Sequence, residues 1–312
     1  MFQKNVERIL TISLTFLAIS SVFVAGVRGQ LPSGTWRTSK QHLPNVLARD
    51  GQLNRVGKFE VFYNRSPEKF HQALRQGLQK SGLFEILAAA LNNSGLVMRT
   101  DIPINFQDCG EANAFYDPSP ENRQIVMCYE LIVQMTEDFA KLNKSSLEDA
   151  LSDAIYASIF VFYHELGHAL IDVLQLPVVG KEEDAVDQFS AIILLNSEAQ
   201  DLAEKTILNA ADWFGIKPKI PAWDEHAPND VRFYYLVCLV YGSDSQKYQA
   251  LTKILPSDRA NRCSREYEKI ANNWTKLLVP HFAEANIPWG SQTPRQSSPR
   301  RPGFNGNRHT IW

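Results

Sequence analysis

The sequence lacks an excess of charge of either sign. Its 32 Lys and Arg residues nearly balance 34 Asp and Glu residues, which leaves a net charge of -2 over 312 residues. A chain with so little net charge has no overall field that would attract nucleic acid or an acidic membrane surface. We therefore expect no nucleic-acid partner, and the function must depend on a local site.

Compositional bias and internal repeats are absent as well. Only 16 residues are Gly and 16 are Pro, whereas 44% are hydrophobic, which excludes collagen, low-complexity disorder and a polytopic membrane protein. No period of 20 to 50 residues recurs, as a repeat protein would require. Once both ends are set aside, about 230 residues remain, enough for one large domain or two joined lobes.

An uncharged run near the N-terminus has the order of an export signal. It extends for 19 residues from Ile9 to Val27, after Lys4 and Arg8 and before a group of small residues. The run is also long enough to be an uncleaved membrane anchor. We predict residues 1–29 to be a signal peptide or membrane anchor, so the protein would be secreted, periplasmic or in the cell envelope. Any membrane contact would come through this segment.

The remaining chain divides by composition. Residues 30–57 mix Pro, Gly, Ser and charges without periodicity, which indicates a leader. Residues 286–312 contain four Pro, four Arg and no acid, which is typical of a disordered basic tail. The folded domain is therefore predicted over residues 58–285.

The four cysteines are an even number in a chain predicted to be exported, where thiols tend to pair. Three pairings are possible. We favour Cys109 with Cys128 and Cys238 with Cys263, because each pair closes a short local loop. A four-thiolate zinc site is disfavoured because the sequence has no CxxC spacing.

Hydrophobic periodicity predicts a small sheet followed by helices. Alternating residues predict strands at Phe59–Tyr63, Ile102–Phe106 and Ile125–Cys128, the last in a hairpin with 113–116. Helices are predicted from Ser66, as N-cap, to about Leu91 with a break at Ser81-Gly82. Further helices are predicted at 129–142, 147–176, 181–196, 197–214, 229–241 and 263–278.

The segment His164-Glu165-Leu166-Gly167-His168 lies inside the longest predicted helix. His164 and His168 are one turn apart on one face, where both imidazoles can reach one ion. Glu165 lies beside that face, so its carboxylate can accept a proton from water. This division of labour is that of HExxH zinc peptidases, with Glu165 as general base.

A catalytic zinc needs a third protein ligand. The next predicted helix supplies Glu183 as this ligand and, four residues later on the same face, Asp187 to accept the outer N–H of a ligating histidine. Glu182 and Asp184 are the competing acids. The alternative reading of this acidic run is a helix N-terminus that favours negative charge.

These motifs resemble the thermolysin-like zinc peptidases (gluzincins), in which HExxH is followed by a Glu-x-x-x-Asp helix. Asn113-Ala114-Phe115-Tyr116 resembles the edge strand that holds the substrate backbone in that family. The resemblance implies that the Asn113 side chain and the Ala114 main chain bind peptide as an added strand. The alternative is a hairpin arm packed beside Cys109.

The order of motifs is similar to a bacterial zinc metallopeptidase family known mainly from sequence. Cys109-Gly110 and Cys128-Tyr129-Glu130 join the motifs above in this order, and the resemblance covers about Lys58 to Phe282. The spacing departs from thermolysin, because only 14 residues separate His168 from Glu183. The resemblance implies a fold and a metal but says little about the substrate.

A peptidase site also needs a donor that stabilises the negative charge on the carbonyl oxygen. Thermolysin-like enzymes use a His and a Tyr outside the metal helices, and the resemblance makes His226 the candidate, with Arg232 or Tyr234 as weaker ones. The other histidines, His42, His71, His281 and His309, are interpreted as surface or packing residues.

Together these patterns predict an α+β, zincin-like fold with a small N-terminal sheet, an HExxH helix and a mainly helical C-terminal lobe. The predicted function is an exported zinc metalloendopeptidase with one Zn2+ per chain, held by His164, His168 and Glu183, acting on peptide or protein substrates. The alternatives are a zinc-stabilised but catalytically silent binding or scaffold protein, and an envelope interaction protein without metal.

Overall fold

The computed structural model describes residues 56–197, 200–221 and 223–283. The predicted signal peptide or anchor, nearly all of the leader and the basic tail lie outside these residues. In the described part, the predicted α+β architecture is confirmed: a four-stranded sheet comes first and is followed by a mainly helical half.

The sheet has the strand order β1-β2-β4-β3. Its strands are β1 (Phe59–Tyr63), β2 (Ile102–Gln107), β3 (Ala114–Asp117) and β4 (Gln124–Cys128). β1, β2 and β4 are parallel, whereas β3 runs antiparallel to β4, with Ala114 opposite Met127. The predicted hairpin is therefore β3–β4, and it leaves β3 at the edge of the sheet.

Eight α-helices occur in the described residues. They are α3 (Lys69–Ser81), α4 (Leu83–Asn93), α5 (Tyr129–Asn143), α6 (Leu147–Leu174), α7 (Glu182–Leu195), α8 (Gln200–Ile216), α9 (Asn229–Ser243) and α10 (Ser257–Leu278). The short 3-10 helices Gln249–Lys253 and Val279–His281 were not part of the sequence prediction.

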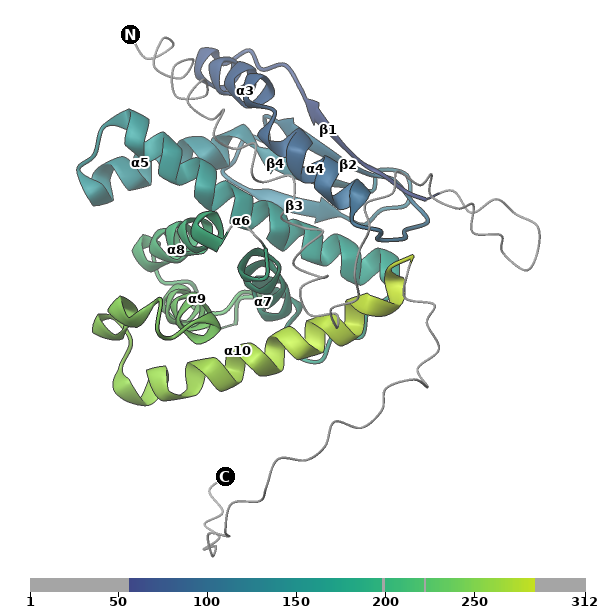
Figure 1. The fold of residues 1–312 in the computed structure, drawn as a ribbon. Coiled ribbons are helices and arrows are strands. Elements are labelled where there is room, and N and C mark those ends of the chain that lie inside the picture. The colour runs from purple at the N-terminus through teal and green to yellow at the C-terminus, as the bar shows by residue number, and fades with distance from the viewer. Residues whose placement is uncertain (1–55, 198–199, 222, 284–312) are drawn as a thin grey trace, which may run out of the picture.

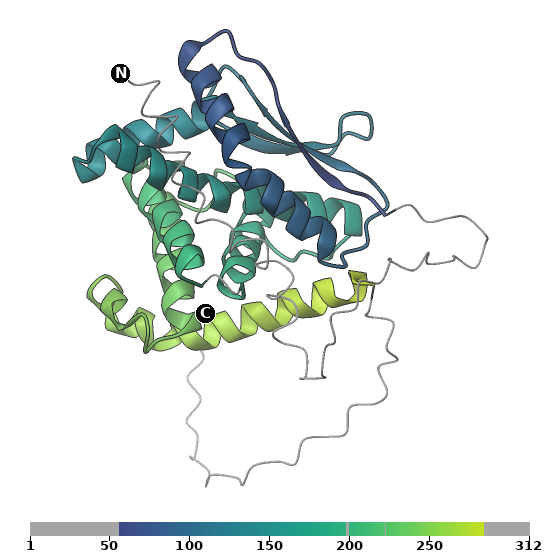
Figure 2. The same ribbon diagram turned by 45° about the horizontal axis from the view of Figure 1, so that its top comes forward.

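α6 runs through the middle of the molecule, with the sheet, α3 and α4 on one side and α7 to α10 on the other (Figure 1). Figure 2 shows the same division after rotation. Of the described helices, α6 alone is long and apolar enough to cross a membrane, but 83% of its most apolar window is buried, as in the core helix of a globular domain. Because α6 contacts both halves, side chains along it can meet groups from each.

Aromatic rings join the sheet to α6. Alternate residues of β2 are fully buried, and the Phe106 ring lies 4.7 Å from that of Phe84 on α4. Phe84 in turn meets Phe162 of α6 edge to face at 5.8 Å. Edge-to-face pairs of this kind add to the free energy of burial. They fix the sheet against the helix that carries the HExxH motif.

Three helix starts differ from the sequence prediction. α3 begins at Lys69, because Ser66 does not cap it: the Ser66 hydroxyl accepts the Glu68 N–H in the preceding turn. α8 begins at Gln200 rather than at 197. α10 begins at Ser257, six residues before Cys263, directly after Pro256, and its polar first turns hide this start from hydrophobic periodicity.

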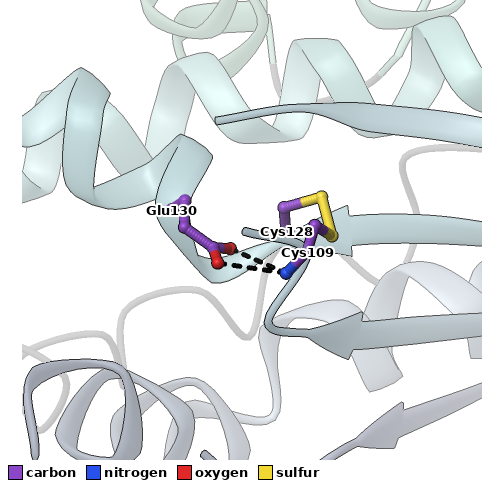
Figure 3. A group of neighbouring side chains, drawn as sticks. All are labelled: Cys109, Cys128 and Glu130. Carbon is purple, nitrogen blue, oxygen red and sulfur yellow. Dashed lines mark hydrogen bonds between the residues drawn. A yellow bond between two sulfur atoms is a disulfide. The ribbon is translucent and has the colours of Figure 1, made fainter. Parts of the chain in front are cut away.

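Both predicted disulfides form. Cys238–Cys263 joins α9 to α10, and Cys109–Cys128 joins the loop after β2 to the end of β4. Figure 3 shows Glu130, in the first turn of α5, with its carboxylate accepting the Cys109 N–H at 3.0 Å. The Cys128 N–H donates to the Asn113 carbonyl at 3.1 Å. The loop that leads into β3 is therefore held at both ends.

Candidate active site

α6 places the histidines and the acid of the motif at the boundary between the two halves. His164 and Glu165 are buried, with 5% and 6% of their surface exposed, and the rings of His164 and His168 lie 5.0 Å apart. The interior of α6 has no Pro and only one Gly, so its hydrogen-bonding continues without a break through the motif. The two imidazoles thus point the same way from successive turns.

α7 brings Glu183 to these imidazoles. The chain turns back from α6 towards α7 at two residues with positive φ. Gln175 at the end of α6 has a φ of 52°, and Gly180 before α7 has a φ of 106°. Glu183 Oε2 then lies 3.0 Å from His164 Nε2, and Glu183 Oε1 lies 3.4 Å from His168 Nε2. Of the competing acids, Glu182 contacts the other nitrogen of His168 instead, at 2.8 Å.

A third imidazole, that of His226, reaches the same carboxylate. Its Nε2 lies 2.9 Å from Glu183 Oε2. It comes from the segment between α8 and α9, which is joined to the start of α7 by a hydrogen bond from the Lys181 ammonium to the Asp224 carbonyl. The predicted oxyanion donor, His226, is therefore next to Glu183. The weaker candidate Tyr234 lies on α9, where 42% of its surface is exposed.

Each imidazole has a second carboxylate on its outer nitrogen. His164 Nδ1 lies 2.8 Å from Asp187 Oδ1, as the Glu-x-x-x-Asp spacing predicts. His168 and His226 have their Nδ1 atoms at 2.8 Å and 3.3 Å from Glu182 and Asp224 respectively. An outer carboxylate of this kind takes the Nδ1–H and leaves the Nε2 lone pair facing inward.

The donor set fits a divalent cation. A neutral imidazole carries one N–H, so an Nδ1–H donated outward leaves Nε2 as an acceptor that faces the Glu183 oxygens, which are also acceptors. Only protons or a metal ion between these atoms can stabilise the arrangement. Imidazole nitrogens and carboxylate oxygens are donors that zinc prefers. In the described residues, the ligand atoms of His164, Glu183 and His226 lie within 4.8 Å of one another, a group that does not include the predicted ligand His168. His168 approaches the other oxygen of Glu183.

Arg232 of α9 acts through Asp187 and not on the site directly. Its guanidinium donates to both Asp187 oxygens, at 2.7 Å and 2.8 Å, and lies over the Phe214 ring. Although burial opposes ionisation, Arg232 and His164 hold the pKa of the Asp187 carboxyl well below its usual range. Arg232, which the sequence offered as a weaker oxyanion donor, therefore keeps Asp187 charged for His164.

Glu165 lies in a different environment from Glu183. Burial raises the pKa of its carboxyl, although His164 and His168 oppose this rise, and the main-chain N–H of Tyr116 in β3 donates to it. A raised pKa suits a carboxyl group to exchange protons with a reacting group. The edge strand thus contacts the predicted general base.

The edge strand is also held by its side chains. The Tyr116 hydroxyl donates to Asp172 Oδ2 of α6 at 2.7 Å, and Arg123 forms an ion pair with the same oxygen at 3.2 Å. Asn113, just before β3, is exposed, and its side-chain oxygen accepts the Ala114 N–H. No local pattern in the sequence points to Asp172, because its partner Tyr116 is 56 residues away.

Gly167 allows α7 to approach α6. A Cβ at this position would lie 2.8 Å and 2.9 Å from two side-chain carbons of Val186 and 3.1 Å from Phe189. We expect Gly167→Ala to lower the free energy of unfolding by about 1–3 kcal/mol, because α7 must shift to relieve this overlap. Urea unfolding of the metal-free protein measures the loss. The double variant Gly167→Ala/Val186→Ala should recover part of it, and a single variant as stable as the wild type would contradict this packing.

Stability of the metal-free protein should fall at alkaline pH. Burial alone would lower the pKa of His164, but hydrogen bonds to Asp187 and Glu183 outweigh it and raise the pKa to about 9. An unfolded histidine titrates near about 6.5, so this stabilisation is complete below that pH and is lost as pH rises through 9, by about 3 kcal/mol. Glu183 and Asp187, whose pKa values are lowered, contribute no change in this window, since their stabilisation is lost only in acid.

The measurement is urea unfolding at pH 6 and pH 9.5, with and without saturating zinc. The metal-free protein should lose stability between the two pH values, whereas bound zinc, which needs neutral imidazoles, should reduce the loss. Equal stability of the metal-free protein at both pH values would contradict the expected titration of His164.

Comparison with known proteins agrees with this geometry. Residues 63–278 match the profile of a protein family described as "Putative metallopeptidase". No curated protein and no solved structure matches the chain. The matched segment covers well over half of the sequence and contains strands β2 to β4, α6, α7 and the segment with His226. The chain therefore belongs to this metallopeptidase family.

Proposed function

We propose that this protein is a zinc endopeptidase of the thermolysin-like type. The observation that carries the proposal is the convergence of His164 Nε2 and His168 Nε2 on the Glu183 carboxylate, at 3.0 Å and 3.4 Å, with a second carboxylate orienting each ring. His164, His168 and Glu183 would hold the ion. Zinc in such a site lowers the pKa of water to about 7 and polarises a carbonyl group.

Other residues of the site would carry out proton transfer, orient the ligands and stabilise charge. Glu165, buried beside the two histidines, accepts the proton of the attacking water and passes it to the leaving nitrogen of the peptide. Asp187 keeps the His164 ring oriented, and Arg232 keeps Asp187 ionised. His226, protonated, would stabilise the negative charge that develops on the carbonyl oxygen.

The substrate is proposed to be an extended peptide that pairs with β3. This strand is at the edge of the sheet, contacts α6, and donates a main-chain N–H to Glu165. An edge strand has free main-chain groups that can bind another chain as an added strand. Asn113, just before β3, and Ala114, its first residue, would exchange their mutual hydrogen bond for bonds to the substrate main chain there.

We further propose that the enzyme acts outside the cytosol. Its two disulfides are of the kind that persists in oxidising compartments, and the sequence begins with the pattern of an export signal. Whether residues 1–29 are removed or remain as an anchor would follow from N-terminal sequencing of the exported protein.

A metal reconstitution assay tests the proposed function. The purified protein should contain about one zinc per chain, cleave internal bonds of an unstructured protein such as casein, lose cleavage after chelation and regain it with one equivalent of zinc. His281→Ala, in the 3-10 helix after α10 and outside every possible metal group of the described residues, is the matched control for His164→Ala, which should lose both zinc and cleavage. Zinc binding without cleavage of any peptide library would instead favour a silent binding protein.

A further inference from the structure

The position of His226 suggests more than an oxyanion donor. Its Nε2 is 2.9 Å from Glu183 Oε2, as close as His164 Nε2, which lies 3.0 Å from the same oxygen. Neighbouring ligands of a tetrahedral zinc lie about 3.3 Å apart, given metal–ligand bonds of about 2.0–2.1 Å. The spacing of His226 from Glu183 is thus that of a ligand, within a few tenths of an ångström.

The hydrogen-bonding of His226 is that of a ligand as well. Its Nδ1 lies 3.3 Å from Asp224 Oδ1, the same arrangement that Asp187 and Glu182 make with the other two imidazoles. A ring that donates its Nδ1–H outward presents a lone pair at Nε2, which binds a cation. The oxyanion donor of the proposed function needs a proton on that atom, so the two roles of His226 would belong to different states of the enzyme.

Among its described residues, the segment that carries His226 is held by exposed polar contacts. Trp223, three residues earlier, is 88% exposed, and His226 itself is 33% exposed along its side chain. Asn229 donates to the Pro218 carbonyl at the base of the segment, and Lys181 donates to Asp224. A segment fixed by a few exposed polar contacts can move at small cost in free energy.

We propose that His226 is a fourth protein ligand of the zinc ion in the substrate-free enzyme and is displaced when substrate binds. Four protein ligands make a closed site, whereas catalysis needs one position open to water. The closed site would suppress hydrolysis until a peptide binds at β3. This inference rests on the proposed function, since it concerns the same ion, and it adds a means of regulation.

X-ray absorption at the zinc edge tests the inference on the unmodified protein. Three imidazoles are expected around zinc in the wild type and two in His226→Ala. Two imidazoles in the wild type would overturn the inference and leave the proposed function intact. A wild type that binds no zinc would overturn the proposed function itself, so the two failures are distinguishable.

Zinc affinity and inhibitor binding give a second test. In competition with a fluorescent chelator, His226→Ala should bind zinc at least about tenfold more weakly than wild type, whereas His281→Ala, outside the possible metal groups of the described residues, should be unchanged. Acetohydroxamate should bind zinc-loaded His226→Ala more tightly than the wild type, because no ligand has to leave. Unchanged zinc and hydroxamate affinities in a His226→Ala protein with wild-type circular dichroism would contradict the proposal.

Discussion

Glu165→Gln is expected to lower kcat/KM for peptide hydrolysis by about 10²–10⁴-fold while leaving zinc bound. The amide has nearly the size of the carboxylate but cannot accept the proton of the attacking water. Glu165 directly follows His164 on α6 and so lies off the helix face that carries the two imidazoles, which should leave the ion in place. Activity and zinc content of the same preparation measure both effects.

Two further variants make this test specific. Glu137→Gln changes an exposed carboxylate on α5, outside the site, so it should reduce activity far less than Glu165→Gln. The Glu165→Gln protein should still bind a peptide that the wild type cleaves, as measured by fluorescence polarisation. Equal rates of cleavage by Glu165→Gln and the wild type would exclude Glu165 as the general base.

Asp187→Asn is expected to lower both stability and zinc affinity. The buried Asp187 carboxylate accepts two hydrogen bonds from Arg232 and faces the Nδ1 of His164. Removing its charge leaves the Arg232 guanidinium, which is 11% exposed, without its counter-ion, and loss of one partner of a buried pair costs about 3–5 kcal/mol. Zinc affinity should fall by about 10–100-fold, because His164 loses the group that orients it.

A double-mutant cycle separates these effects. Arg232→Gln should also destabilise the protein, and the double variant Asp187→Asn/Arg232→Gln should lose less stability than the sum of the two single losses, because no unpaired buried charge remains. Urea unfolding of the metal-free proteins measures the coupling, and chelator competition measures zinc affinity. A loss below about 1 kcal/mol in Asp187→Asn would show that the ion pair contributes little to stability.

The sequence predicts the central residues of this site better than the distant residues that contact them. His164 and His168 follow from a helical spacing within one element, and Glu183 and Asp187 follow from the same spacing in the next one. Local periodicity is enough for such pairs. It contains no information on which distant groups meet them.

The residues that hold the site in place come from distant parts of the chain. Arg232 is 45 residues from Asp187, and Asp172 is 56 residues from Tyr116. Contacts of this range depend on how α6 packs against the edge strand and α9, which no short window of sequence shows. The same limit applies to His226, for which the sequence suggested a role but not its distance from Glu183.

The two contacts of Tyr116 have a consequence for which substrates the enzyme can use. This one residue reaches α6 at Glu165 through its main chain and at Asp172 through its hydroxyl, two helical turns apart. A flat, fully extended chain can align with β3 without moving it, whereas a bulky folded surface would push the strand outward and carry the Glu165 contact with it. We therefore expect the enzyme to degrade unfolded or partly unfolded proteins and to spare compact native ones.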